Sequence, residues 1–235
     1  MKLTILGNNG PFPSAGGACS SYLLEAGALK ILIDMGSGSL AELQKKFSIT
    51  DIDVIILTHL HYDHVADIFV LKYAYSVNKK GLLKKPILFM PQQPSEQYKA
   101  IKDSRFEIVD INNGLKKNIS DVQISFIKVP HPVECYAVSI VHNDKRFVFS
   151  ADTYDEKPLL DIVKDADLFL VDAGLMQKDK TDMSAHFSVK EACELGCHAK
   201  KTLLTHFSPI YSKDEILSEV CCGAELSERG KEYRI

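Results

Sequence analysis

The chain has 235 residues, a formal net charge of −3 and a pI near 6.2, which exclude a general electrostatic attraction to nucleic acid. Its 46% hydrophobic and 25% charged residues are typical of a globular protein, and its length suits a single α/β domain over residues 1–235. No run approaches the about 20 apolar residues of a membrane span, and residues 1–7 do not resemble a signal peptide, so we expect a cytoplasmic protein without a membrane partner.

The first half of the chain alternates strand-like and helical segments. Apolar and alternating runs predict strands at 3–6, 21–25, 30–34, 54–57, 86–90 and 107–111. The spacing of apolar residues predicts helices that end near residue 47 and that span 66–78 and 96–104.

The second half repeats this succession. Strands are predicted at 122–129, 136–142, 146–150, 168–172 and 201–205, with an edge strand at 231–235, and helices at 159–164, 188–199 and 214–221. Ser188 and Glu191 have the spacing of a capping box at a helix start, and Asn143-Asp144-Lys145 predicts a tight hairpin turn. Because each half of the chain contains strands followed by helices, we predict two packed sheets with helices outside them.

A cluster of metal-binding residue types follows the apolar strand 54–57. His59 and His61 share one face of an extended segment, and Asp63 and His64 follow in a turn, so the four groups can line two adjacent coordination sites. Imidazole and carboxylate together suit zinc, iron or manganese rather than calcium. A solvated histidine-rich loop is the alternative interpretation.

Three further candidate ligands each follow a predicted strand. His131 lies between two prolines that stiffen its loop, Asp152 follows an apolar run, and His206 follows strand 201–205. A carboxylate at the position of Asp152 can bridge two cations with its two oxygens. As alternatives, His131 could be a turn residue and Asp152 a helix-capping residue.

The order of these groups resembles that of the metallo-β-lactamase fold superfamily, and the resemblance covers the whole chain. It implies a four-layer αββα sandwich of two mixed β-sheets flanked by helices, with a two-metal site at one edge. The two divalent ions would be zinc, with manganese or iron as alternatives. The implied ligands are His59, His61 and His131 for one metal, Asp63, His64 and His206 for the other, and Asp152 for both.

The segment around His186, which precedes the predicted helix 188–199, is similar to that of the tRNase Z and related phosphodiesterase branch. This likeness implies that His186 assists the leaving group. A hydroxide that bridges the metals would be the nucleophile, and Asp63 would handle its proton. Asp34 resembles the superfamily's aspartate that steadies the metal-binding loop. His186 could instead flank the helix without a chemical role.

Two departures from tRNase Z favour a small substrate. Only 20 residues, 132–151, separate His131 from Asp152, so a tRNA-gripping arm does not fit there, and Ile210 stands where that branch has an arginine. We therefore predict a phosphodiesterase that acts on small or unstructured phosphodiesters such as a cyclic nucleotide. The alternatives are a tRNA 3′-end endonuclease, a hydrolase of carboxylic esters, lactones or thioesters, and a non-enzymatic metal-binding protein.

Other features leave more than one interpretation open. Lysines 72, 79, 80, 84 and 85 form a solvated helix face or line the cleft, and Cys193 and Cys197 are expected to be buried rather than to bind a metal. The aromatic segment 69–75 would pack in the core or form a homodimer face.

Overall fold

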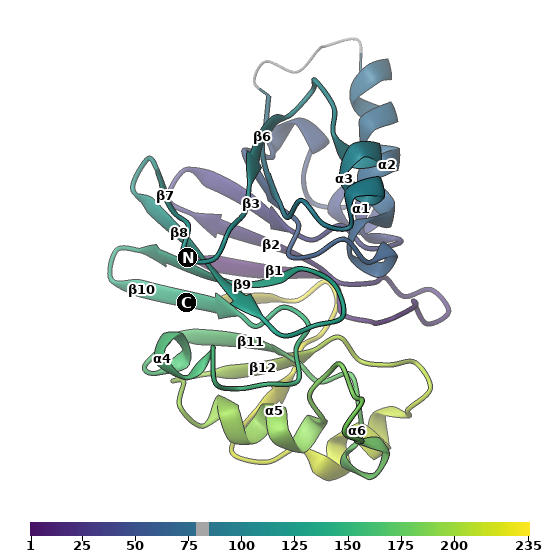
Figure 1. The fold of residues 1–235 in the computed structure, drawn as a ribbon, viewed down its shortest axis with the longest axis vertical. Helices are drawn as coiled ribbons and strands as arrows, with labels where there is room; N and C mark the ends of the chain where they lie inside the picture. The colour runs from purple at the N-terminus through teal and green to yellow at the C-terminus, as the bar shows by residue number, and fades with distance from the viewer. Residues whose placement is uncertain (79–84) are drawn as a thin grey trace.

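The computed structural model describes residues 1–78 and 85–235. Two seven-stranded sheets pack face to face in this part of the chain, and helices cover the outer face of each sheet (Figure 1). This is the predicted four-layer αββα arrangement, so the expected fold class is confirmed.

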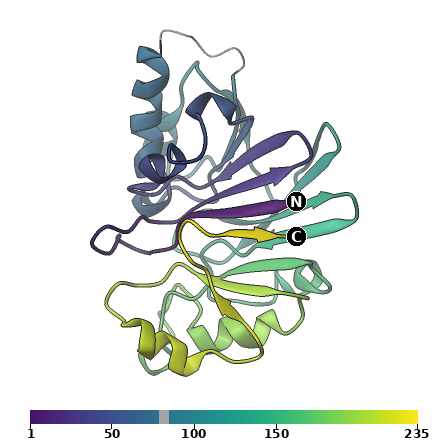
Figure 2. The same cartoon turned by 180° about the vertical axis from the view of Figure 1, so that it is seen from behind.

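The first sheet is mixed. The pairs β14–β1, β1–β2 and β2–β3 are antiparallel, whereas the pairs β3–β4, β4–β5 and β5–β6 are parallel. Figure 2 shows the two chain ends side by side, because β14 pairs with β1 as the predicted edge strand. The sheet order is β14 (Glu232–Arg234), β1 (Lys2–Gly7), β2 (Ser21–Ala26), β3 (Leu29–Ile33), β4 (Val54–Ile56), β5 (Ile87–Met90) and β6 (Glu107–Asp110).

The second sheet is also mixed, with antiparallel pairing from β7 to β10 and parallel pairing from β10 to β13. Consequently β8, β10, β11 and β12 all end at the same edge of the sheet. The sheet order is β13 (Glu225–Leu226), β12 (Thr202–Thr205), β11 (Leu168–Asp172), β10 (Lys145–Phe149), β9 (Cys135–His142), β8 (Val122–Val129) and β7 (Lys116–Ile119).

Helices α1 to α3 lie over the first sheet and α4 to α6 over the second (Figure 1). None of the helices in the described residues is long and apolar enough to cross a membrane. Their bounds are α1 (Ser39–Leu43), α2 (Tyr62–Val77), α3 (Ser95–Ile101), α4 (Leu160–Val163), α5 (Val189–Gly196) and α6 (Lys213–Glu219), with short 3₁₀ turns at Ile49–Asp51 and Gln177–Asp179.

The central strands β2 to β5 of the first sheet are largely buried and apolar on both faces, because each face packs against another layer. In β2, Tyr22 and Leu24 point into the core between the sheets, while Leu23 points toward α1 and α2. This division follows from the alternation of side chains along a strand. The rigid sandwich therefore fixes the strand ends from which the candidate site is built.

Several local features differ from the predictions. Helix α2 begins at Tyr62, so Asp63 and His64 lie in its first turn rather than in a loop. Helix α1 ends at Leu43, earlier than predicted. Strand β7 was not predicted, because its exposed polar residues show no apolar alternation and it pairs only at the sheet edge.

The lysine and cysteine interpretations are also resolved in part. Lys72 donates to the carbonyl of Ala100 at 2.7 Å, so it lies against α3 and not in a cleft; Lys79, Lys80 and Lys84 lie outside the described residues. Cys193 is buried as predicted, but the prediction was wrong for Cys197, which is exposed at the end of α5.

Candidate metal centre

All seven predicted ligands meet at the edge where β4, β8, β10 and β12 end. His59, His131, Asp152 and His206 each lie within three residues of the end of one of these strands. The remaining ligands come from the segment that enters α2 and from the first turn of that helix. Short loops on two packed sheets therefore place side chains from distant parts of the sequence together.

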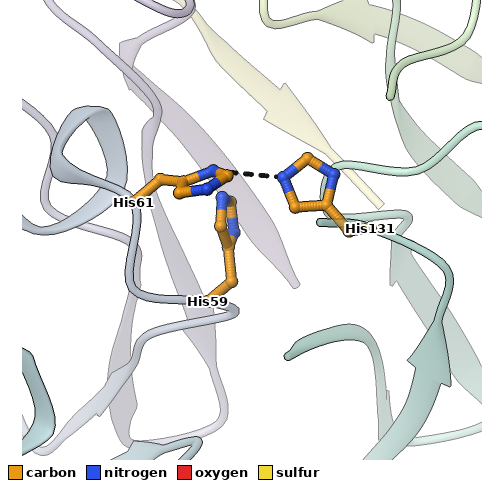
Figure 3. A group of neighbouring side chains, drawn as sticks. All are labelled: His59, His61 and His131. Atoms are coloured by element: carbon orange, nitrogen blue, oxygen red, sulfur yellow. Dashed lines mark hydrogen bonds between the residues drawn. The ribbon is translucent and has the colours of Figure 1, made fainter. Parts of the chain in front are cut away.

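Three histidines form the first group. Nitrogen atoms of His59, His61 and His131 all lie within 4.8 Å of one another. Figure 3 shows His59 and His61 on one loop and His131 on another, with the three rings turned toward a common point. Nε2 of His131 is 3.1 Å from Nδ1 of His61. This is the set that the superfamily resemblance implied for one metal.

The second group contains Asp63, His64 and His206, whose ligand atoms also lie within 4.8 Å of one another. Asp152 lies between the groups: its Oδ2 is 3.2 Å from Nε2 of His64 and of His206, and 3.6 Å from Nε2 of His59. A carboxylate at this place can be shared by two cations.

The residues present fit a divalent transition metal. Nε2 of His59, Nε2 of His64 and Oδ1 of Asp152 are buried and have no hydrogen-bond partner among the described residues. Such unsatisfied buried atoms cost about 1–3 kcal/mol each, and cations held by the two groups of ligands would satisfy these atoms. Imidazole nitrogens with carboxylates are the donors that zinc, manganese and iron accept.

The electrostatics of the first group favour metal binding. Burial lowers the pKa of His59 well below its usual range and lowers that of His131 to about 4. Both imidazoles are therefore neutral at pH 7, so their lone pairs are available to a cation.

Asp34 holds the metal-binding loop, as the resemblance implied. It directly follows β3 and has a positive φ of 57°, and its carboxylate accepts hydrogen bonds from the backbone N–H of Thr58 at 2.8 Å and from the Thr58 hydroxyl. It also accepts from Nδ1 of His64 at 2.8 Å, which leaves Nε2 of that ring to face the site.

Asp172 is a functional candidate that the sequence analysis missed. It ends β11, is fully buried, and accepts a hydrogen bond from Nδ1 of His186 at 2.8 Å. The available signal was a carboxylate at the end of a buried strand, the pattern already noted for Asp34 and Asp152.

His186 lies beside the candidate metal ligands, as predicted, and its ring stacks on that of His206 at a centroid distance of 4.9 Å. Burial alone would lower the pKa of His186, but the Asp172 carboxylate raises it above its usual value. One atom of His186 also lies within 4.8 Å of ligand atoms of Asp152, Asp172 and His206, so proximity alone does not separate a proton donor from a ligand.

The chain is similar in sequence and in fold to known proteins. Residues 15–183 match the family model of the metallo-beta-lactamase superfamily. The chain is 29% identical over 224 residues to “Probable metallo-hydrolase YhfI” of Bacillus subtilis (strain 168), with 93% of this chain and 92% of YhfI covered. The crystal structure of YhfI, a metallo-beta-lactamase fold protein, superposes with a TM-score of 0.90 at 26% identity and covers 99% of this chain and 98% of YhfI.

Two more distant structures share the fold. The short form of human tRNase Z superposes with a TM-score of 0.81 at 19% identity, over 100% of this chain and 99% of that chain. A diphosphatase from the PhnP family superposes with a TM-score of 0.77 at 16% identity, over 100% of this chain and 97% of that chain.

Proposed function

This chain belongs to the metallo-beta-lactamase superfamily, and from that premise we propose that it is a two-metal phosphodiesterase acting on small or unstructured phosphodiesters. Its family membership makes it a metal-dependent hydrolase. The proposal adds the bond that it cleaves, the number of metals and zinc as the metal.

The pair formed by Asp172 and His186 is the observation that most favours a phosphodiester. Because the carboxylate can only accept, Nδ1 of His186 donates to it, and Nε2 is left for a substrate atom beside the metal ligands. The departing oxygen of a phosphodiester gains charge as the bond breaks, and a positioned imidazole can give it a proton.

The residues divide the remaining work between them. Two divalent cations held by His59, His61 and His131, by Asp63, His64 and His206, and by Asp152 would activate water and neutralise charge on the phosphate oxygens. Asp63, which is 3.2 Å from Nε2 of His206, would accept the proton of the attacking water. Asp172 would keep the His186 ring in one tautomer and orientation throughout.

The more distant structures support chemistry at phosphorus, because tRNase and diphosphatase are both names of enzymes that cleave phosphate linkages. The hairpin of β9 and β10 occupies most of the segment between His131 and Asp152 and supports a small substrate over a folded tRNA.

A matched substrate panel tests the bond type. Purified, zinc-loaded protein should cleave bis(p-nitrophenyl) phosphate with a kcat/KM well above those for p-nitrophenyl acetate, a simple lactone and a thioester. A higher kcat/KM for any of the three carboxylic substrates would overturn the phosphodiesterase assignment and leave the metal-dependent hydrolase intact.

A further inference from the structure

A cavity of about 270 Å³ opens beside His131, at the end of the candidate metal centre. Two loops that also hold site residues form most of its wall: one follows Asp152 and the other precedes His186. The loops are held together at this point, because Nδ1 of His131 is 3.3 Å from the carbonyl oxygen of Ala185. The lining residues are His131, Pro132, Tyr154, Asp182, Met183, Ser184 and Ala185.

Two large apolar side chains in this wall are exposed to solvent. Tyr154 is 47% exposed and Met183 is 91% exposed, so neither contributes much to the core. Because both side chains line one cavity, they form a continuous exposed surface that a ligand can cover. Here they lie two positions after Asp152 and three before His186, next to the proposed chemistry.

The chemistry of the wall suits a flat heterocycle. A tyrosine ring offers a π face, a methionine side chain adapts its shape to an aromatic ring, and Pro132 adds a rigid apolar surface. Cavities that hold drug-sized ligands span about 300–1,000 Å³, so one of about 270 Å³ is large enough for a single heterocycle. The Asp182 carboxylate can accept hydrogen bonds from the amino group of a base.

We propose that this cavity binds the base of a nucleotide phosphodiester, with Tyr154 and Met183 stacking on the ring while the phosphate lies at the metal centre. The inference rests on the proposed phosphodiesterase function, and it narrows the substrate class from any small diester to diesters of nucleosides. His131 joins the two parts, since it belongs both to the first histidine group and to the cavity wall.

Two substrates with the same leaving group test the proposal. Thymidine 5′-(p-nitrophenyl phosphate) has a base, and the 5′-(p-nitrophenyl phosphate) of 1,2-dideoxyribose has the same sugar without a base, so the ratio of their kcat/KM values isolates the contribution of the base. Stacking contributes about 1–3 kcal/mol per base, so Tyr154→Ala and Met183→Ala should each lower this ratio by about 5- to 150-fold. Tyr154→Phe, which keeps the ring, should retain the ratio of the wild type.

A second readout does not depend on turnover. In protein with ¹³C-labelled methionine methyl groups, adenosine 5′-monophosphate should shift the Met183 resonance by the ring current of the base, whereas inorganic phosphate should not. The matched control is Tyr73→Ala, which removes a 74%-exposed tyrosine far along α2 from the site and should leave both the ratio and the shift unchanged.

The outcomes separate this inference from the function on which it rests. If the wild type cleaves both diesters with equal kcat/KM, or if the alanine variants lower both equally, the base-binding cavity is wrong while the phosphodiesterase stands. If the wild type cleaves neither diester but hydrolyses carboxylic esters, the proposed function fails; a Met183 shift caused by the nucleotide would then still support the cavity.

Discussion

At the scale of single residues, the metal content should depend most on Asp152. Its carboxylate lies within 3.6 Å of the Nε2 atoms of His59, His64 and His206, so it lies beside both groups of proposed ligands. We expect Asp152→Ala to lose most of its bound metal, as measured by elemental analysis after gel filtration. The control Asp121→Ala removes an exposed aspartate that pairs with His142. Two metals retained in Asp152→Ala would contradict the bridging role.

His186 should act on the rate rather than on the metal. His186→Ala should keep both metals and the fold, and should slow phosphodiester cleavage by roughly 10²- to 10⁴-fold, the usual contribution of a positioned general acid. The loss should be smallest with p-nitrophenolate as leaving group, because that oxygen needs little protonation.

Retention of metal is the control for this prediction, because His186 lies close enough to Asp152 and His206 to be a ligand. A variant that loses metal, or one whose rate deficit is the same for alkoxide and p-nitrophenolate leaving groups, would show that His186 is not the proton donor.

The residue types and their order along the chain were sufficient to predict the ligand candidates, but not Asp172. Many strands end in an aspartate. The importance of this one depends on β11 lying between β10 and β12, which brings its carboxylate to His186 and His206. Sheet order is a non-local property that the local pattern around residue 172 does not contain.

At the scale of elements, the sequence predicted a helix start correctly where nearby side chains satisfy its backbone N–H groups. The capping box at α5 forms as expected: Ser188 Oγ accepts from the N–H of Glu191 at 3.2 Å, and Glu191 Oε2 accepts from the N–H of Ser188 at 2.9 Å. Strand β7 was missed because only pairing with β8 makes it a strand. The start of α2 was placed too late because the metal-binding histidines obscure its first turn.

A cluster of ion pairs around Asp167, just before β11, should make the free energy of unfolding depend on pH. Asp167 is half-buried, and its carboxylate accepts from the N–H of Arg146 at 2.9 Å and from the ammonium groups of Lys145 and Lys200 at 2.9 and 3.1 Å. Burial would raise the pKa of Asp167, but these three donors lower it to about 2. Because the folded value lies below the unfolded one, the stabilisation is complete above about pH 4 and is lost as the pH falls toward 2.

Asp167→Asn should therefore lower the free energy of unfolding by about 1–2 kcal/mol at pH 7. The difference from the wild type should stay constant from pH 7 to 5 and shrink below pH 4, as followed by urea denaturation monitored by circular dichroism. Asp161→Asn, at an exposed position in α4, should change little. A difference that grows as the pH falls would show that the carboxylate is not stabilised by these cations.

At the scale of the whole molecule, the two successions of strands and helices were sufficient to predict two packed sheets, because each succession has apolar strands that need a layer on both faces. The order of strands in each sheet was not predictable in this way. The convergence of His59, His131 and His206 became predictable only through the resemblance to a known superfamily, since nothing local relates segments so far apart in the chain.

The short segment between His131 and Asp152 supports the proposed small substrate. The β9–β10 hairpin turns at Asn143 and Asp144, which have positive φ values of 50° and 60°, and it leaves no length in residues 132–151 for an arm that could grip tRNA. Ile210, which is 68% exposed, provides no positive charge where the related branch has an arginine. The chain should therefore cleave bis(p-nitrophenyl) phosphate with a higher kcat/KM than precursor tRNA.

Charge at position 210 offers a direct test of this limit. Ile210→Arg should increase the affinity for tRNA in a salt-dependent way, because a new phosphate contact releases counterions, and Ile210→Gln is the neutral control of similar size. In both variants the kcat/KM for precursor tRNA should stay well below that for the small diester, because the missing arm is not restored. If the unmodified protein already processes precursor tRNA at its 3′ end with a kcat/KM above every small diester, then size does not limit the substrate and the protein is a tRNA-processing endonuclease.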